Sequence, residues 1–312
     1  MAYWARGYTF IWGKGDVPKA LADYTEAIRL DPKYAEAFCS RADAYFHKGD
    51  FDRAMADYGE AIRLDPKLAE AYSGRGRVFN MKGEYAKAIG DLTEALRLNP
   101  KSAEAYSGRG AAYHNKGDCD KAIADYTEAI RLDPKFAHAY CGRGAAYVNK
   151  GDCDKAIADY TEALRLDPKF AHAYYGRGVA YVNKGDFAKA MPDFAEAIRL
   201  DPKFAEAYWG RGYVFAEKGD LDKAIADYTE SLRLNPKYAE AYSSRGDAYR
   251  KKGALDRAIA DYTEAIRLDP KDADAHYGRG AAYEKKGEKA KAEEDFARAK
   301  KLGFQPEKSK TK

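Results

Sequence analysis

Proline recurs at one fixed interval through most of this chain, and this recurrence constrains the fold more than any other feature of the sequence. The interval is 34 residues, and the prolines are Pro32, Pro66, Pro100, Pro134, Pro168, Pro202, Pro236 and Pro270. Between them runs a phrase that changes little, such as Lys-Gly-Asp-Cys-Asp-Lys-Ala-Ile-Ala-Asp-Tyr-Thr-Glu-Ala-Ile-Arg-Leu-Asp-Pro at 116–134. A period of this length indicates stacked units that bury their apolar faces against their neighbours.

Each repeat is predicted to contain two helices. In the fifth repeat the first helix covers about 137–149 and ends at Gly151, because glycine suits the left-handed conformation that closes a helix. Asp152 then serves as N-cap of a second helix, which the pair Asp167-Pro168 stops. The glycines at the place of Gly151 are Gly15, Gly49, Gly83, Gly117, Gly185, Gly219, Gly253 and Gly287.

Aromatic and small residues also recur at fixed places. In the fifth repeat these residues are Tyr140, Gly144, Tyr147, Ala156, Tyr160, Ala163 and Pro168. The pattern resembles the tetratricopeptide repeat family, in a bacterial style, and the resemblance covers residues 1–306. It implies an all-α fold, a right-handed superhelical solenoid of antiparallel helix pairs. It also implies a concave inner face that binds partners.

The resemblance gives a single solenoid of nine tandem repeats followed by a polar tail at 307–312. The repeats are 1–34, 35–68, 69–102, 103–136, 137–170, 171–204, 205–238, 239–272 and 273–306. The first repeat fits if one extra residue lies in its turn, near Gly13. In the ninth, Glu293 and Lys300 replace apolar residues that face the next repeat elsewhere, so we expect the array to end there.

Composition narrows the class of protein. Lys plus Arg number 54 against 50 for Asp plus Glu, which gives no strong electrostatic case for nucleic acid or anionic lipid. No apolar run is long enough to span a membrane, and the first residues lack the pattern of a signal peptide. Four cysteines in a chain of this length do not form a disulfide framework. We therefore expect a cytoplasmic protein with reduced thiols.

An arginine recurs at one place in the first helix, and an aspartate recurs at one place in the second. Arg143 and Asp159 are the examples in the fifth repeat. The arginines could form a basic ladder for an acidic ligand, or each could pair with an aspartate of the scaffold. Their strict co-occurrence favours the second interpretation, with each pair inside one repeat or across one junction.

No pattern indicates catalysis, a cofactor or a metal. The recurring Gly-Arg-Gly, as at 142–144, lacks the Gly-Lys-Ser/Thr ending of a phosphate-binding loop. His138, Cys141 and His172 could ligate zinc, but no Cys-x-x-Cys pair or carboxylate-plus-histidine motif supports that reading. Carboxylates recur in every repeat, as scaffold residues do. We therefore predict a protein that is not an enzyme and holds neither cofactor nor metal.

Function is expected where the repeats differ, on the face that the family resemblance assigns to the first helices. All three tryptophans fall on this face, and aromatic anchors dominate protein interfaces. The predicted partner-binding residues are Trp4, Tyr8, Trp12, Phe46, Asn115, Asn149, Tyr175, Val179, Val182, Asn183, Trp209 and Tyr213. Among them, Tyr175, Val179, Val182, Trp209 and Tyr213 should form an apolar cradle, and the asparagines could bond a peptide backbone. Trp4 and Trp12 could instead cap the N-terminal end.

The leading hypothesis is a scaffold that binds a protein or peptide in its concave groove. The alternatives are a nucleic-acid-binding solenoid that uses Lys116, Lys150 and Lys184, and an adaptor in an enzyme complex. Some family members clamp the acidic C-termini of Hsp70- or Hsp90-type chaperones. The places of that clamp hold glutamates here, as at Glu70 and Glu104, and a glutamate repels a carboxylate. A clamp of that kind is not expected.

Overall fold

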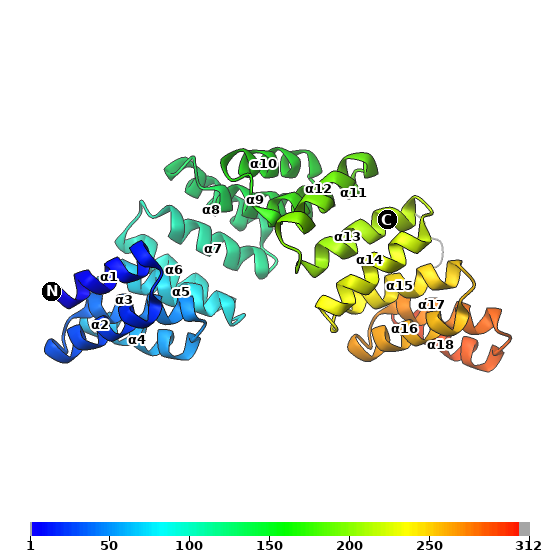
Figure 1. Ribbon diagram of the computed structural model, residues 1–312, viewed down its shortest axis with the longest axis horizontal. Helices are drawn as coiled ribbons and strands as arrows, with labels where there is room; N and C mark the ends of the chain where they lie inside the picture. Colours follow the sequence, from blue (N-terminus) through cyan, green and yellow to red (C-terminus); the bar gives the residue numbers. More distant parts are fainter. Residues whose placement is uncertain (1, 306–312) are drawn as a thin grey trace. The chain divides into compact units, whose positions relative to one another are not determined.

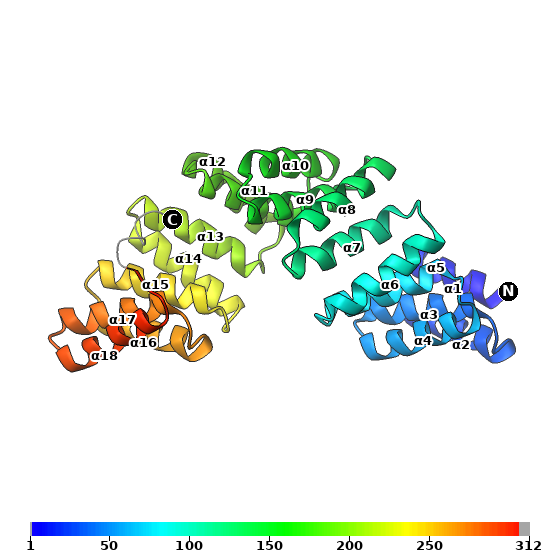
Figure 2. The same cartoon turned by 180° about the vertical axis from the view of Figure 1, so that it is seen from behind.

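The computed structural model describes residues 2–305, and these residues form eighteen α-helices and no strand. They fall into two compact units, an N-terminal unit that ends at Asp152 and a C-terminal unit that begins at Cys153. The N-terminal unit contains α1 (Ala2–Lys14), α2 (Val17–Leu30), α3 (Ala35–Lys48), α4 (Phe51–Leu64), α5 (Ala69–Met81), α6 (Tyr85–Leu98), α7 (Ala103–Asn115), α8 (Cys119–Leu132) and α9 (Ala137–Asn149). The C-terminal unit contains α10 (Cys153–Leu166), α11 (Ala171–Asn183), α12 (Phe187–Leu200), α13 (Ala205–Glu217), α14 (Leu221–Leu234), α15 (Ala239–Lys251), α16 (Leu255–Leu268), α17 (Ala273–Lys285) and α18 (Lys289–Lys301). Within each unit the helices pair as the sequence predicts (Figure 1, Figure 2).

Turn chemistry fixes the helix ends. Gly49 follows α3 with φ of 80°, and its N–H donates to the carbonyls of the last turn. The Asp50 carboxylate then accepts a hydrogen bond from the backbone N–H of Arg53 and caps α4. The glycines at the place of Gly49 all have positive φ, which confirms the predicted left-handed turns.

The first turn contains the predicted extra residue. The N–H of Asp16 donates to the carbonyl of Phe10, six positions back, whereas that of Asp50 donates to Tyr45, five positions back. The insertion therefore lies between Phe10 and Gly15, as the sequence predicts. At the other end Glu293 and Lys300 are exposed on α18. The predicted tail at 307–312 lies outside the described residues.

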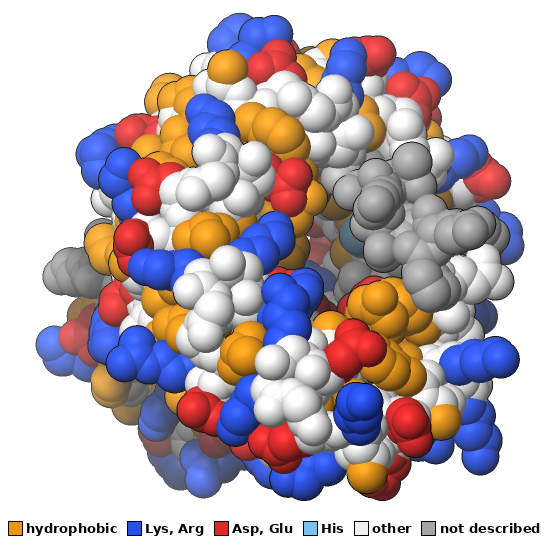
Figure 3. Space-filling view, turned by 90° about the vertical axis from the view of Figure 1, so that its right-hand side faces the viewer, with side chains coloured by type: hydrophobic (Ala, Val, Ile, Leu, Met, Phe, Trp, Pro, Cys, Tyr) orange, Lys and Arg blue, Asp and Glu red, His pale blue; other side chains and the backbone are white. Residues whose placement is uncertain are grey.

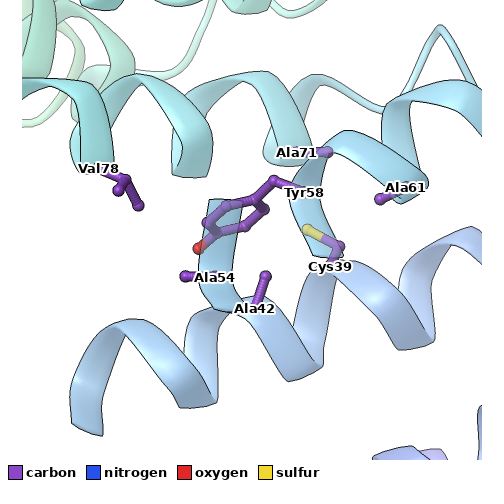
Figure 4. Close-up of a cluster of buried hydrophobic side chains, with 7 residues drawn as sticks. All are labelled: Cys39, Ala42, Ala54, Tyr58, Ala61, Ala71 and Val78. Carbon is purple, nitrogen blue, oxygen red and sulfur yellow. The ribbon is translucent and has the colours of Figure 1, made fainter. Parts of the chain in front are cut away.

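A large side chain from each second helix fills the core of its repeat, an aromatic ring in every repeat except the third, where it is Leu92. Figure 4 shows the Tyr58 ring between α3, α4 and α5, among alanines, Cys39 and Val78. A Cβ on Gly74 would lie 2.3 Å from this ring, so the glycine lets α5 approach it. The recurring Gly-Arg-Gly is thus a packing element inside a helix.

The repeated arginine and aspartate form a two-pronged ion pair inside each repeat where the pair is described. Arg41 donates from Nε to Asp57 at 2.7 Å and from its terminal nitrogen at 2.9 Å, and this bonding raises the pKa of Arg41. Because a half-buried charge is costly without a partner, loss of either residue would destabilise the scaffold. The equivalent pairs are Arg6–Asp23, Arg75–Asp91, Arg109–Asp125, Arg177–Asp193, Arg211–Asp227, Arg245–Asp261 and Arg279–Asp295. For these repeats the scaffold interpretation is confirmed.

The first helices line the inner side of each unit. In the N-terminal unit α1, α3, α5, α7 and α9 contact one another in succession, and in the C-terminal unit α11, α13, α15 and α17 do the same. Within each unit, the described second helices make no such contact with one another. A stack whose first helices approach more closely than its second helices presents the first helices on its inner face.

Candidate functional site

The inner face of the C-terminal unit contains an apolar recess of about 490 Å³. Most of its lining comes from α11 and α13, with single residues from α12 and α17. The lining residues are Val179, Val182, Asn183, Phe194, Trp209, Gly210, Tyr213, Glu217 and Asp274. We call this cavity the α11–α13 recess.

Phe194 and Gly210 make the floor of this recess apolar. Phe194 takes the place of Tyr58, whose hydroxyl donates to Asp43 at 2.6 Å. The residue at the place of Asp43 here is Val179, which packs against Phe194 and offers no acceptor. A Cβ on Gly210 would lie 2.7 Å from the Phe194 ring, so only glycine leaves this part of the floor open.

Trp209 forms a wall of the recess and is held in place. Its Nε1 donates a hydrogen bond to Oγ of Ser244 at 3.0 Å. Its ring centroid lies 6.1 Å from that of Tyr213 and 6.0 Å from that of Tyr238. The indole is therefore fixed before any partner binds.

Tyr175 supports the recess from behind and does not line it. Its ring contacts Phe204 and Phe194, with centroids 5.0 and 5.9 Å away. Burial, together with the smaller effect of the charges of Glu206 and Glu240, raises the pKa of Tyr175 to about 12. Of the five predicted cradle residues, the structure brings four into one lining and places the fifth beside it.

The other predicted residues lie in the N-terminal unit. Trp4 donates from Nε1 to Ser40 at 2.9 Å and lies 6.0 Å from Tyr8, which is 52% exposed. Phe46 lies under the guanidinium of Arg77, at 5.0 Å, and is partly covered by it. The predicted Trp12 belongs to α1, but its side chain lies outside the described residues.

The three predicted asparagines have different surroundings. Asn183 is exposed and lines the recess. The Asn149 amide lies 2.8 Å from Nε2 of His114, so this amide is already engaged by its own unit. Asn115 ends α7 and is exposed. A shared role for the three in binding a peptide backbone stays a prediction.

Sequence reasoning missed four lining residues as site candidates, namely Phe194, Gly210, Glu217 and Asp274. Part of the recess could have been found by comparing neighbouring stretches of the sequence. The stretches 116–149 and 150–183 differ at three positions, two of which are Tyr175 and Val179. The substitutions that separate two nearly identical repeats thus cluster at the recess.

At several of the turns after the first helices, a lysine pairs with an aspartate of the preceding repeat. Lys82 bonds Asp52 at 2.8 Å, and Lys286 bonds Asp256 at 2.5 Å. Of the three lysines considered for nucleic acid, Lys150 and Lys184 pair in the same way. For Lys116 the place of the aspartate holds Ala86. On the face seen in Figure 3, acidic and basic side chains are interspersed. This charge pattern does not favour a nucleic-acid interface.

The described range, residues 2–305, contains neither a membrane-spanning helix nor a cluster of metal-ligating side chains. No helix in this range has the length and apolar character needed to cross a membrane. Within the same range no three His, Cys, Asp or Glu side chains are grouped so that they could hold a metal ion.

Models of known protein families match ranges that cover most of the chain. A family model described as TPR repeat matches residues 14–49, 42–83, 76–117, 115–151, 212–253 and 246–287. Two models described as tetratricopeptide repeat match 141–203 and 273–302. No curated protein sequence matches.

Solved structures show the same fold. A chain from the crystal structure of the APC/C hetero-tetramer Cut9-Hcn1 superposes with a TM-score of 0.70 at 22% identity. The match covers 92% of this chain and 56% of that one, so this chain spans little more than half of that relative. A tetratricopeptide repeat protein from Parabacteroides merdae ATCC 43184 gives 0.62 at 21% identity, over 80% of this chain and 98% of the other. Its repeats, its paired helices and these matches together show that the chain belongs to the tetratricopeptide repeat family.

Proposed function

We propose that this protein is a non-catalytic scaffold that binds a segment of a partner protein, with an apolar side chain of that segment held in the α11–α13 recess. Tetratricopeptide repeats indicate a protein-interaction scaffold, and the fold is typically non-catalytic. The observation that carries the proposal is the apolar floor made by Phe194 and Gly210 beneath the fixed wall of Trp209.

The recess has the properties of an anchor pocket. Its walls are aromatic and aliphatic side chains on rigid helices, so binding orders few groups of the scaffold. Burial of one leucine or phenylalanine side chain contributes about 1.5–3 kcal/mol. The Asn183 amide at the edge of the recess can bond the backbone beside that side chain.

A peptide selection tests this proposal. A random peptide library is selected on the whole chain, and the binding of enriched peptides is measured by fluorescence anisotropy. Val179→Gln puts an amide into the recess without adding charge, so we expect it to weaken binding about fivefold or more. Ala111→Gln is the matched control, because Ala111 holds the same place in α7 of the N-terminal unit.

The outcome that contradicts the proposal is equal binding of the enriched peptides to wild type and Val179→Gln. Circular dichroism of each variant establishes that the helices remain folded. A loss of binding in Ala111→Gln alone would place the site in the N-terminal unit instead.

A further inference from the structure

The α11–α13 recess has an acidic rim. Glu217 and Asp274 line it, and its lining contains no lysine or arginine. The inner face of the N-terminal unit differs. A smaller cavity there, of about 380 Å³, is lined by charges of both signs, and its Arg77 pairs with Asp43 at 2.8 Å. The negative charge is thus specific to the apolar recess.

Two further glutamates extend the acidic rim along the first helices. Glu206 of α13 and Glu240 of α15 hold the same place as Asp274 of α17, the second residue of each helix. The charges of both glutamates act on the Tyr175 hydroxyl behind the recess and on that of Tyr238, which contacts Trp209. Asp274 therefore lies at the recess itself, and Glu206 and Glu240 lie near the tyrosines that support it.

Within the described part of the chain, none of these carboxylates is neutralised by an ion pair. Among residues 2–305, no ion pair within 4.0 Å joins Glu206, Glu217, Glu240 or Asp274 to a basic side chain. The guanidinium of Arg250 on α15 is engaged by Asp247 at 2.7 Å and by the Tyr262 hydroxyl at 3.1 Å.

The other basic side chains on α13, α15 and α17 are either paired or distant from the helix ends that carry Glu206, Glu240 and Asp274. Arg211, Arg245 and Arg279 are bonded to the aspartates of the second helices. Lys251 and Lys285 lie at the ends of α15 and α17, opposite to Glu240 and Asp274. A helix of this length separates its two ends by about 18 Å, which is more than a Debye length at physiological salt.

We propose that the partner segment is basic, with a lysine or arginine within a few residues of the apolar side chain that enters the recess. This inference rests on the proposed function and adds the charge of the ligand. An ammonium or guanidinium beside the apolar anchor meets unpaired carboxylates, whereas an acidic segment meets repulsion. Each exposed pair contributes little, so the preference comes from several carboxylates together.

Three labelled peptide pools test this inference. Each pool has a central Leu-Phe pair, flanked by lysines in the first pool, glutamines in the second and glutamates in the third. We expect the lysine pool to bind about tenfold more tightly than the glutamate pool, with the glutamine pool between them and the difference shrinking with added salt. The net charge of +4 on the whole protein would by itself favour the glutamate pool. Tighter binding of the lysine pool therefore cannot come from the net charge of the protein.

A charge-neutralising variant locates the preference. The triple change Glu206→Gln, Glu240→Gln and Asp274→Asn should remove most of the difference between the pools. The matched control changes Glu36→Gln and Glu104→Gln at the same place in α3 and α7, and it should leave the difference intact.

The two proposals fail in different ways. If the three pools bind alike and Val179→Gln weakens them all, the basic segment is wrong and the apolar site stands. If the triple change leaves the tenfold preference intact, the acidic rim is not its source and this inference is overturned. If Val179→Gln weakens the binding of none of the pools, the proposed function is wrong, and the inference that rests on it is wrong as well.

Discussion

Nε1 of Trp209 donates a hydrogen bond to Oγ of Ser244, and this bond joins the first helices of two successive repeats. Trp4 makes the equivalent bond to Ser40 at 2.9 Å. The tryptophan at this place therefore stabilises a junction as well as forming a wall of the recess. Truncation of Trp209 tests both roles at once, so variants that separate the roles are needed.

Trp209→Phe keeps an aromatic wall and removes the bond to Ser244. We expect the free energy of unfolding to fall by about 1 kcal/mol, the usual net contribution of one hydrogen bond, with part of the fall due to the smaller ring. Ser244→Ala should cost a similar amount, and the double variant should cost less than the sum. Denaturant unfolding measures all three, and strict additivity would contradict a coupling through this bond.

Two glycines should respond to alanine in opposite directions. A Cβ on Gly176 would lie 2.4 Å from the Tyr160 ring. Gly176→Ala should therefore destabilise the protein by about 1–3 kcal/mol through overpacking. Gly90 is exposed inside α6 and has no atom within 4 Å of the added Cβ. Gly90→Ala should stabilise by about 1 kcal/mol because alanine favours the helix. A thermal shift of the same sign in both variants would contradict this prediction.

Ser231 is a buried side chain whose hydroxyl has no hydrogen-bond partner in the described structure. The same place in α12 holds Ala197, which is also fully buried. Ser231→Ala should raise the free energy of unfolding by about 1 kcal/mol or more, because a polar group is no longer buried without a partner. The reverse change Ala197→Ser is the matched control and should lower it. Chemical denaturation of both variants gives the comparison.

Lys218 lacks the aspartate that pairs with the equivalent lysines, because its place in the preceding repeat is Ala188. Lys184 and Lys252, on either side in the sequence, pair with Asp154 and Asp222. Ala188→Asp should add a surface ion pair of about 0.5 kcal/mol that weakens with salt. In a Lys218→Ala background the gain should shrink to what an aspartate near a helix N-terminus contributes alone. Equal gains in both backgrounds would show that no ion pair forms.

The period of the sequence was enough to predict the helices, the left-handed glycines and the extra residue before Gly15. These features depend on contacts within one repeat or between neighbours, and a sequence with a fixed period displays such contacts directly. The Arg41–Asp57 pair could be predicted for the same reason, since both residues recur together.

The site was less accessible from the sequence. Val179 and Trp209 could be chosen because they depart from the other repeats. Asp274 could not, because it belongs to α17 and reaches the recess only through the rotation that accumulates between repeats. The contacts of Asn149 with His114 and of Phe46 with Arg77 depend on side-chain conformations, which the repeat pattern does not specify. Binding by the predicted residues stays a prediction.

The ion pairs between turn lysines and aspartates of the preceding repeat have a consequence for how such a chain evolves. Each junction that carries the pair presents the same charge on the same side, so a repeat inserted or deleted as a whole meets matching neighbours. Recombination between nearly identical stretches of the gene, such as those that encode 116–149 and 150–183, can therefore lengthen or shorten the array without unfolding it. A duplicated copy then needs few substitutions, such as those at Tyr175 and Val179, to acquire a binding surface of its own.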